Sequence, residues 1–80
     1  MTMLAVFRSR AQALEYISVL KAGGVPAQAV STPKEAGVGC GISARFDEAF
    51  LSRARAVLVK KTYSSFSGFM VIRGNRFSYI

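Results

Sequence analysis

The sequence predicts an α+β domain in which two helices pack on an antiparallel sheet. Three observations support this prediction. Short apolar runs of the kind found in strands alternate with two stretches in which apolar residues recur every three or four positions, as they do on one face of a helix. Glycine, proline and polar residues separate these segments. The length of 80 residues, with 51% hydrophobic and 19% charged residues, fits one globular domain spanning residues 1–80.

The first strand and the first helix are predicted from the start of the chain. Residues 3–7 form a continuous apolar run, which indicates a central strand. Ser9 is a suitable N-cap, and Gln12 three residues later completes a capping-box pattern. The apolar residues that follow recur at helical spacing until Gly23–Gly24, where the access of glycine to left-handed dihedral angles ends the helix.

The middle of the chain predicts two further strands and a second helix. Residues 25–30 form the second strand, and Pro26 places it at an edge of the sheet, because proline cannot donate to a neighbouring strand. Residues 41–46 alternate between apolar and polar side chains and form the third strand. Asp47 is a good N-cap for the second helix, whose last turn carries Lys60–Lys61.

The end of the chain predicts a fourth strand at residues 66–72. A Gly74–Asn75 turn then predicts that residues 74–80 fold back as an add-on tail strand. The order strand, helix, strand, strand, helix, strand is that of the ferredoxin-like split βαβ arrangement, for which we expect the sheet order 4-1-3-2 with both helices on one face. The other face is expected to be open, or to be covered by a partner or by the tail.

The segment 31–41 contains Cys40, the only cysteine of the chain, between Gly39 and Gly41. The directions of the predicted strands and helices bring this segment to the same end of the sheet as the Arg8–Ser9 turn. A helix N-terminus and nearby cations lower the pKa of a thiol and favour its nucleophilic thiolate form. Glycines also allow backbone amides to turn toward an anion. The predicted site consists of Cys40 as the reactive residue and of Arg8, Ser9, Lys34, Gly39 and Gly41 as the residues that bind the transferred group.

An inert Cys40 is the alternative. Free cysteine is among the most buried residue types and usually packs as a small hydrophobe, whereas the flanking glycines favour an exposed turn. The chain contains no histidine, so hydrolysis by a Cys–His pair is excluded in its usual form, while group transfer through a thiolate needs no general base. One cysteine without histidine offers neither a zinc site nor an internal disulfide, and no metal or other cofactor is expected.

Several short motifs between residues 3 and 60 occur in a specific order. They are Val6–Ser9 leading into Ala13–Leu14, then Thr32–Lys34, then Cys40–Gly41 ahead of Phe46–Asp47. In these motifs the chain resembles the small bacterial proteins described as putative selenium/sulfur carrier-like proteins. The resemblance implies a carrier, not a turnover enzyme, that holds sulfur or selenium as a persulfide or selenopersulfide on Cys40. It also implies partner proteins that donate and accept the atom.

The formal net charge is +7, from 11 basic and 4 acidic residues. The basic residues are scattered through the chain and are explained by surface solvation, so no nucleic-acid partner is expected. The sequence has no apolar run long enough to span a membrane and no signal-peptide pattern. A soluble cytoplasmic protein without a membrane partner is therefore expected.

Two other functions stay open. An RNA-binding module of the same fold would stack bases on exposed aromatic side chains of its central strands, for which Phe7 and Phe46 are the candidates. A non-catalytic interaction or regulatory domain would instead pair through its sheet or its C-terminal tail, and would form a homo-oligomer. The apolar segments 69–72 and 77–80 motivate this second alternative.

Overall fold

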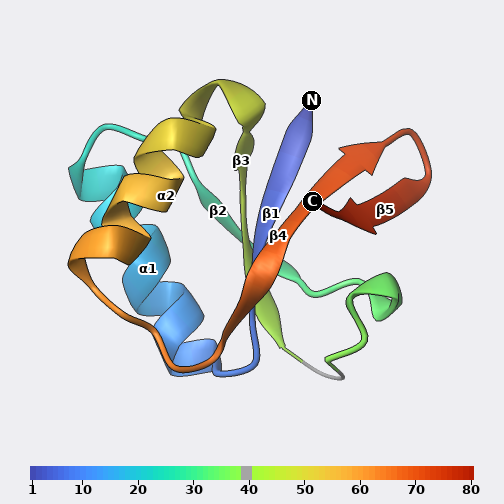
Figure 1. Ribbon diagram of the computed structural model, residues 1–80, viewed down its shortest axis with the longest axis horizontal. Coiled ribbons are helices and arrows are strands. Elements are labelled where there is room, and N and C mark those ends of the chain that lie inside the picture. Colours follow the sequence, from blue (N-terminus) through green and yellow to red (C-terminus); the bar gives the residue numbers. More distant parts are fainter. Residues whose placement is uncertain (39–40) are drawn as a thin grey trace.

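The computed structural model describes residues 1–38 and 41–80. This described part of the chain forms two helices, five strands and two short 3-10 turns (Figure 1). Neither of its helices is long and apolar enough to cross a membrane. In chain order the elements are β1 (Thr2–Phe7), α1 (Arg10–Ala22), β2 (Gln28–Ser31), η1 (Lys34–Ala36), β3 (Ile42–Asp47), η2 (Glu48–Phe50), α2 (Leu51–Lys60), β4 (Phe66–Arg73) and β5 (Arg76–Tyr79).

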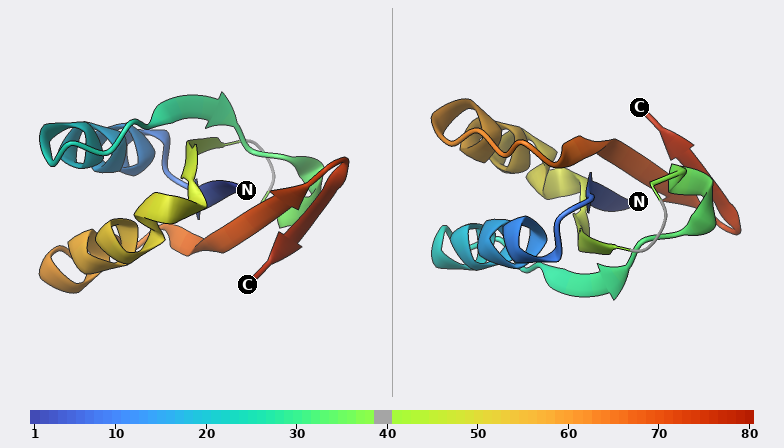
Figure 2. Two further views of the ribbon diagram at one scale, coloured as in Figure 1. Left: turned by 90° about the horizontal axis from the view of Figure 1, so that it is seen from above. Right: turned by 90° about the horizontal axis from the view of Figure 1, so that it is seen from below.

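The sheet is antiparallel throughout, and its strands follow the order β2-β3-β1-β4-β5. The expected order 4-1-3-2 is therefore not matched as it stands, because β5 pairs with β4 and turns β4 from an edge strand into an inner strand. β2 lies at the opposite edge, as Pro26 predicts. Figures 1 and 2 show both helices on one side of the sheet, with η1 and β5 on the other side.

The second strand begins later than predicted, since it covers Gln28–Ser31 and not residues 25–30. Pro26 has no N–H group to offer, so pairing with β3 starts two residues after it. The apolar residues around the proline serve the core instead, where Val25 and Ala27 are only 2% and 4% exposed. The prediction is therefore right for residues 28–30, whereas residues 25–27 are apolar because they are buried before the strand begins.

Both ends of α1 carry the caps that the sequence predicts. At the start, the Ser9 Oγ accepts a hydrogen bond from the Gln12 N–H over 3.2 Å. At the end, Gly24 adopts a φ of 86°, and the Val25 N–H donates to the Leu20 carbonyl over 2.9 Å, as in a Schellman motif. The Ser9 cap therefore determines where α1 begins, shortly after the end of β1.

The main core lies between the sheet and the helices and is rich in aromatic rings. Phe7 is completely buried, and its ring centroid lies 5.1 Å from that of Tyr16, 5.6 Å from that of Tyr63 and 5.4 Å from that of Phe66. Tilted and edge-on contacts of this kind are favourable for aromatic pairs. The Tyr16 hydroxyl also donates to the Ala54 carbonyl of α2 over 2.8 Å, so this ring joins the two helices.

A second, smaller apolar cluster lies on the face of the sheet away from the helices. Leu4, Val6 and Met70 are buried there together with Ala36 of η1. The Tyr79 hydroxyl of β5 donates to the Ala36 carbonyl over 2.7 Å. β5, the strand expected from the tail, and η1 therefore cover part of this face together.

Candidate functional site

Gly41, the residue after Cys40, lies directly against the end of β1. A Cβ atom at Gly41 would lie 2.9 Å from the Phe7 carbonyl oxygen, which is closer than real Cβ atoms come. The Thr32 N–H donates to the Gly41 carbonyl over 3.0 Å and so joins the two ends of the segment that contains Cys40. Phe7 immediately precedes the Arg8–Ser9 turn, so a glycine at position 41 allows the chain to lie beside the start of α1.

We expect Gly41→Ala to lower the free energy of unfolding by about 1–3 kcal/mol, because the added methyl group overlaps a backbone oxygen that cannot rotate away. Chemical denaturation of both proteins measures the difference. Gly23→Ala is the matched control, since its Cβ would meet its nearest neighbour at 3.5 Å and its φ is −86°. An unchanged Gly41→Ala, or an equal loss in both variants, would contradict the close approach.

The start of α1 is electrically positive. Its first turn contains no acidic residue, and the first N–H groups of a helix carry a partial positive charge. Arg8 and Arg10 flank the Ser9 cap, and both side chains are exposed to solvent. An anion placed beside this turn would therefore meet the positive end of the helix dipole, next to two exposed basic residues.

The Gln12 side chain fastens the connector between α2 and β4 to the same place. Its Oε1 accepts hydrogen bonds from the Ser65 N–H over 2.9 Å and from the Ser65 hydroxyl over 2.7 Å. Its Nε2 group is 3.0 Å from the Ser64 hydroxyl, and the Arg8 N–H donates to the Ser65 carbonyl over 3.0 Å. The sequence predicts that this side chain closes a capping box with Ser9. It instead contacts residues more than 50 positions further along the chain, and no local sequence pattern indicates such contacts.

Lys34 lies apart from this turn. It begins η1, whose Ala36 packs in the second cluster, on the face of the sheet away from α1. Figure 1 shows η1 beside β5, and the Lys34 side chain is exposed. Of the six predicted site residues, the structure brings Arg8, Ser9 and Gly41 to one end of the sheet and leaves Lys34 on the other face, while Gly39 and Cys40 lie outside the described residues.

Lys61, in the basic connector after α2, is already engaged. Its ammonium group forms an ion pair with the Glu15 carboxylate of α1. The hydrogen bond from Lys61 lowers the pKa of Glu15, and the same bond raises the pKa of Lys61. Tyr63 lies next to the pair, with its ring centroid 5.7 Å from the ammonium nitrogen, and burial raises the pKa of its hydroxyl. Lys61 therefore contributes less free positive charge to its surroundings than the sequence indicates.

The acid dependence of stability tests this ion pair. Glu15 has a folded-state pKa below its ordinary value of 4.5, so its contribution to stability is present above that value and is lost as the pH falls through the lowered pKa. We expect Glu15→Gln to lower the melting temperature at neutral pH, and the difference from wild type to vanish in acid. Glu35→Gln is the control, because Glu35 forms no ion pair among the described residues. A difference that persists in acid would argue against the pair.

Phe7 and Phe46 lie in the main core and not on the open face. They are 0% and 3% exposed, and the Phe46 ring packs edge-on against Phe69. Alternate residues of a strand share a face, and both rings fall on the face that the helices cover. The two candidate rings therefore do not form an exposed stacking surface, and the RNA-binding alternative loses the residues that motivated it.

The apolar tail segments are divided between core and surface. Phe69, Met70 and Val71 are buried, whereas Tyr79 and Ile80 are 42% and 61% exposed. An interaction surface on the tail would therefore depend on these last two side chains.

Fold and sequence together define a small α+β domain whose single cysteine directly precedes a glycine packed against the end of the first strand. The family described as putative Se/S carrier protein-like matches residues 2–67, and the chain belongs to this family. No curated protein and no solved structure matches the chain. The matched range ends near the start of β4, so β5 lies beyond it.

Proposed function

We propose that this protein is a sulfur or selenium carrier that holds the transferred atom as a persulfide or selenopersulfide on Cys40. Membership of the Se/S carrier-like family supports a carrier role in general. The observation that carries the proposal furthest is the contact of Gly41 with the Phe7 carbonyl, because it holds the residue next to the cysteine beside the positive start of α1. Cys40 is also the only cysteine in the sequence, so no other residue can form the persulfide.

The chemistry needs a thiolate and no general base. The Cys40 thiolate would attack the outer sulfur of a cysteine persulfide on a donor protein. A new S–S bond forms to Cys40 while the S–S bond of the donor breaks, and the donor cysteine leaves as a thiolate. Atoms and charge balance, and no external oxidant is required. The thiolate of an acceptor protein then removes the outer sulfur by the same exchange, and with selenium the outer atom is selenium.

The residues around the α1 start would favour this exchange. Arg8 and the helix N-terminus stabilise a thiolate or a persulfide anion and lower its pKa. Ser9 fixes the first turn through its bond to the Gln12 N–H, while Gly39 and Gly41 leave the cysteine without bulky sequence neighbours. Lys34, which lies on the other face, is proposed to contact an approaching partner protein. The Cys40 thiol stays free only in a reducing compartment, so we propose that the protein acts in the cytoplasm.

We also infer that the fold is a ferredoxin-like arrangement extended by one strand. Starting from the β5 edge, the strand order is 5-4-1-3-2, which is the four-strand order 4-1-3-2 with β5 added beside β4. Superposition of the structure on known ferredoxin-like domains would test this relation. A crossover connection that differs from theirs would overturn it.

Incubation with a cysteine desulfurase and free cysteine, followed by intact mass measurement, tests the function. We expect a mass increase of one sulfur atom on the wild-type protein, and its removal by a thiol reductant. Cys40→Ser is the matched control, because this variant has no thiol, and it should gain no mass. An unmodified wild type, or an equal adduct on Cys40→Ser, would sink the proposal.

A further inference from the structure

Tyr79 of β5 holds η1 in place on the face of the sheet away from the helices. Its hydroxyl donates a hydrogen bond to the Ala36 carbonyl over 2.7 Å. Its ring lies on Gly68 of β4, where an added Cβ atom would be only 3.1 Å from the ring. Figures 1 and 2 show β5 and η1 side by side on this face. Tyr79 therefore rests on β4 with its ring and reaches η1 with its hydroxyl.

η1 leads directly into the cysteine segment. Val38, two residues after η1 ends, packs against the second cluster. On the other side of the cysteine, Gly41 lies against the Phe7 carbonyl. Only residues 39 and 40, which lie outside the described residues, join Val38 to Gly41. Three residue steps span no more than about 11 Å, so the residues between these two anchors must follow a shift of either one.

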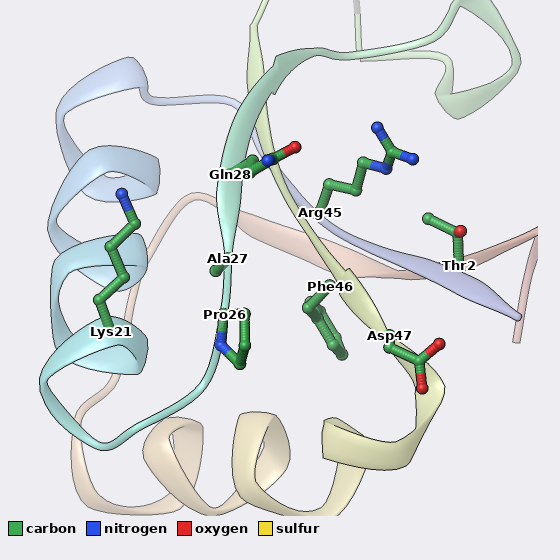
Figure 3. A pocket seen from close by; sticks show the side chains of 8 residues that line it. All are labelled: Thr2, Lys21, Pro26, Ala27, Gln28, Arg45, Phe46 and Asp47. Carbon is green, nitrogen blue, oxygen red and sulfur yellow. The ribbon is translucent and has the colours of Figure 1, made fainter.

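The cover of this face is limited to the part next to the cysteine segment. Ser43, near the start of β3, is completely buried, and its hydroxyl is 2.8 Å from that of Thr32. Arg45 lies two residues further along β3 on the same face. It is exposed, and Figure 3 shows its side chain pointing away from α1. The covered part of the face therefore ends between these two residues, on the side where β3 begins.

We propose that Tyr79 is a positioning residue for Cys40 and acts on it through η1. This inference rests on the proposed function. While Tyr79 holds Ala36, the anchors at Val38 and Gly41 are both in place, and the thiol is kept near the positive start of α1, which favours the thiolate. The family match ends before β5, so the tail adds a control of reactivity that lies beyond the matched range.

Hydrogen exchange of the η1 amides tests the contact between Tyr79 and η1. The Gly37 N–H donates to the Lys34 carbonyl over 3.0 Å, so its exchange reports the local opening of η1. We expect Tyr79→Phe to speed up this exchange about twofold to tenfold, the equilibrium effect of losing one hydrogen bond.

The pH dependence of alkylation by iodoacetamide tests the effect on the thiol. Cys40 is the only cysteine, so the rate reports on this residue alone. The thiolate is the reactive form, and nearly all of a thiol is ionised at about pH 9.5. We expect the ratio of the rate at about pH 7 to the rate at about pH 9.5 to be about twofold to fivefold lower in Tyr79→Phe than in wild type. A ratio is used because a change in access to the thiol alters both rates equally.

Tyr16→Phe is the matched control. It removes the same kind of bond, from a tyrosine hydroxyl to the Ala54 carbonyl over 2.8 Å, but on the other side of the sheet from η1. We expect it to change the Gly37 exchange and the alkylation ratio less than about twofold, because it does not affect the local opening of η1.

Equal changes in the two variants would show a general loss of stability and overturn the proposal. Unchanged exchange or an unchanged ratio in Tyr79→Phe would overturn it as well. Neither measurement involves a persulfide. A wild-type protein that gains no sulfur from the desulfurase would therefore count against the carrier function, whereas these two measurements decide the role of Tyr79.

Discussion

Replacing Phe7 by alanine is expected to lower the free energy of unfolding by about 3–5 kcal/mol, the usual cost of removing a buried aromatic ring. Phe7 is completely buried, and its ring contacts Tyr16 of α1, Tyr63 of the connector and Phe66 of β4. The resulting cavity would lie where three elements meet, so none of them can close it alone. A domain of this size has a total stability of only about 4–12 kcal/mol, and the loss is a large part of it.

Urea denaturation at several temperatures measures this loss. Val59→Ala is the control, because Val59 is 85% exposed and its truncation should change stability by less than about 0.5 kcal/mol. If Phe7→Ala does not fold, Phe7→Leu keeps part of the volume and should cost about 1–2 kcal/mol. A Phe7→Leu variant as stable as wild type would show that the ring is not a packing centre.

The sequence predicts the helices and most strands because their signals are local. The cap at Ser9, the glycine end of α1 and the alternation in β3 each depend on residues a few positions apart. The start of the strand predicted at residues 25–30 is misplaced, because the buried residues just before this strand are as apolar as the strand itself. Proline at position 26 identified the edge of the sheet correctly but not the first paired residue.

The site is only partly predictable for a different reason. The order of strands and helices along the chain determines the direction of each strand. These directions are enough to predict that Gly41 lies near the Arg8–Ser9 turn. They say nothing about the face on which a loop residue lies, and Lys34 falls on the face away from α1. The Gln12 contacts and the Glu15–Lys61 pair join residues more than 45 positions apart, and no local pattern reports such pairs.

The second large effect is expected from deleting residues 74–80, which removes β5. Phe77 packs against the second cluster, which contains Leu4, Val6 and Met70, and Tyr79 lies opposite Met70 in the β4–β5 pairing. Uncovering on the order of 100–150 Å² of apolar surface at about 25 cal/mol per Å² costs about 3 kcal/mol. Tyr79→Phe isolates the hydrogen bond to Ala36 and should cost about 0.5–1.5 kcal/mol, provided that its ring keeps its place over Gly68.

The mass of the shortened protein in solution separates two roles of β5. If the tail mainly covers the second cluster, its removal exposes Met70 and Leu4, and light scattering should show unchanged or increased association, because exposed apolar patches favour self-contact. If the tail instead joins two copies through Tyr79 and Ile80, which are exposed, the deletion should convert an oligomer into a monomer. We expect the first result, since the Tyr79 hydroxyl is already bonded within the chain. A wild-type oligomer that dissociates on deletion would establish the second.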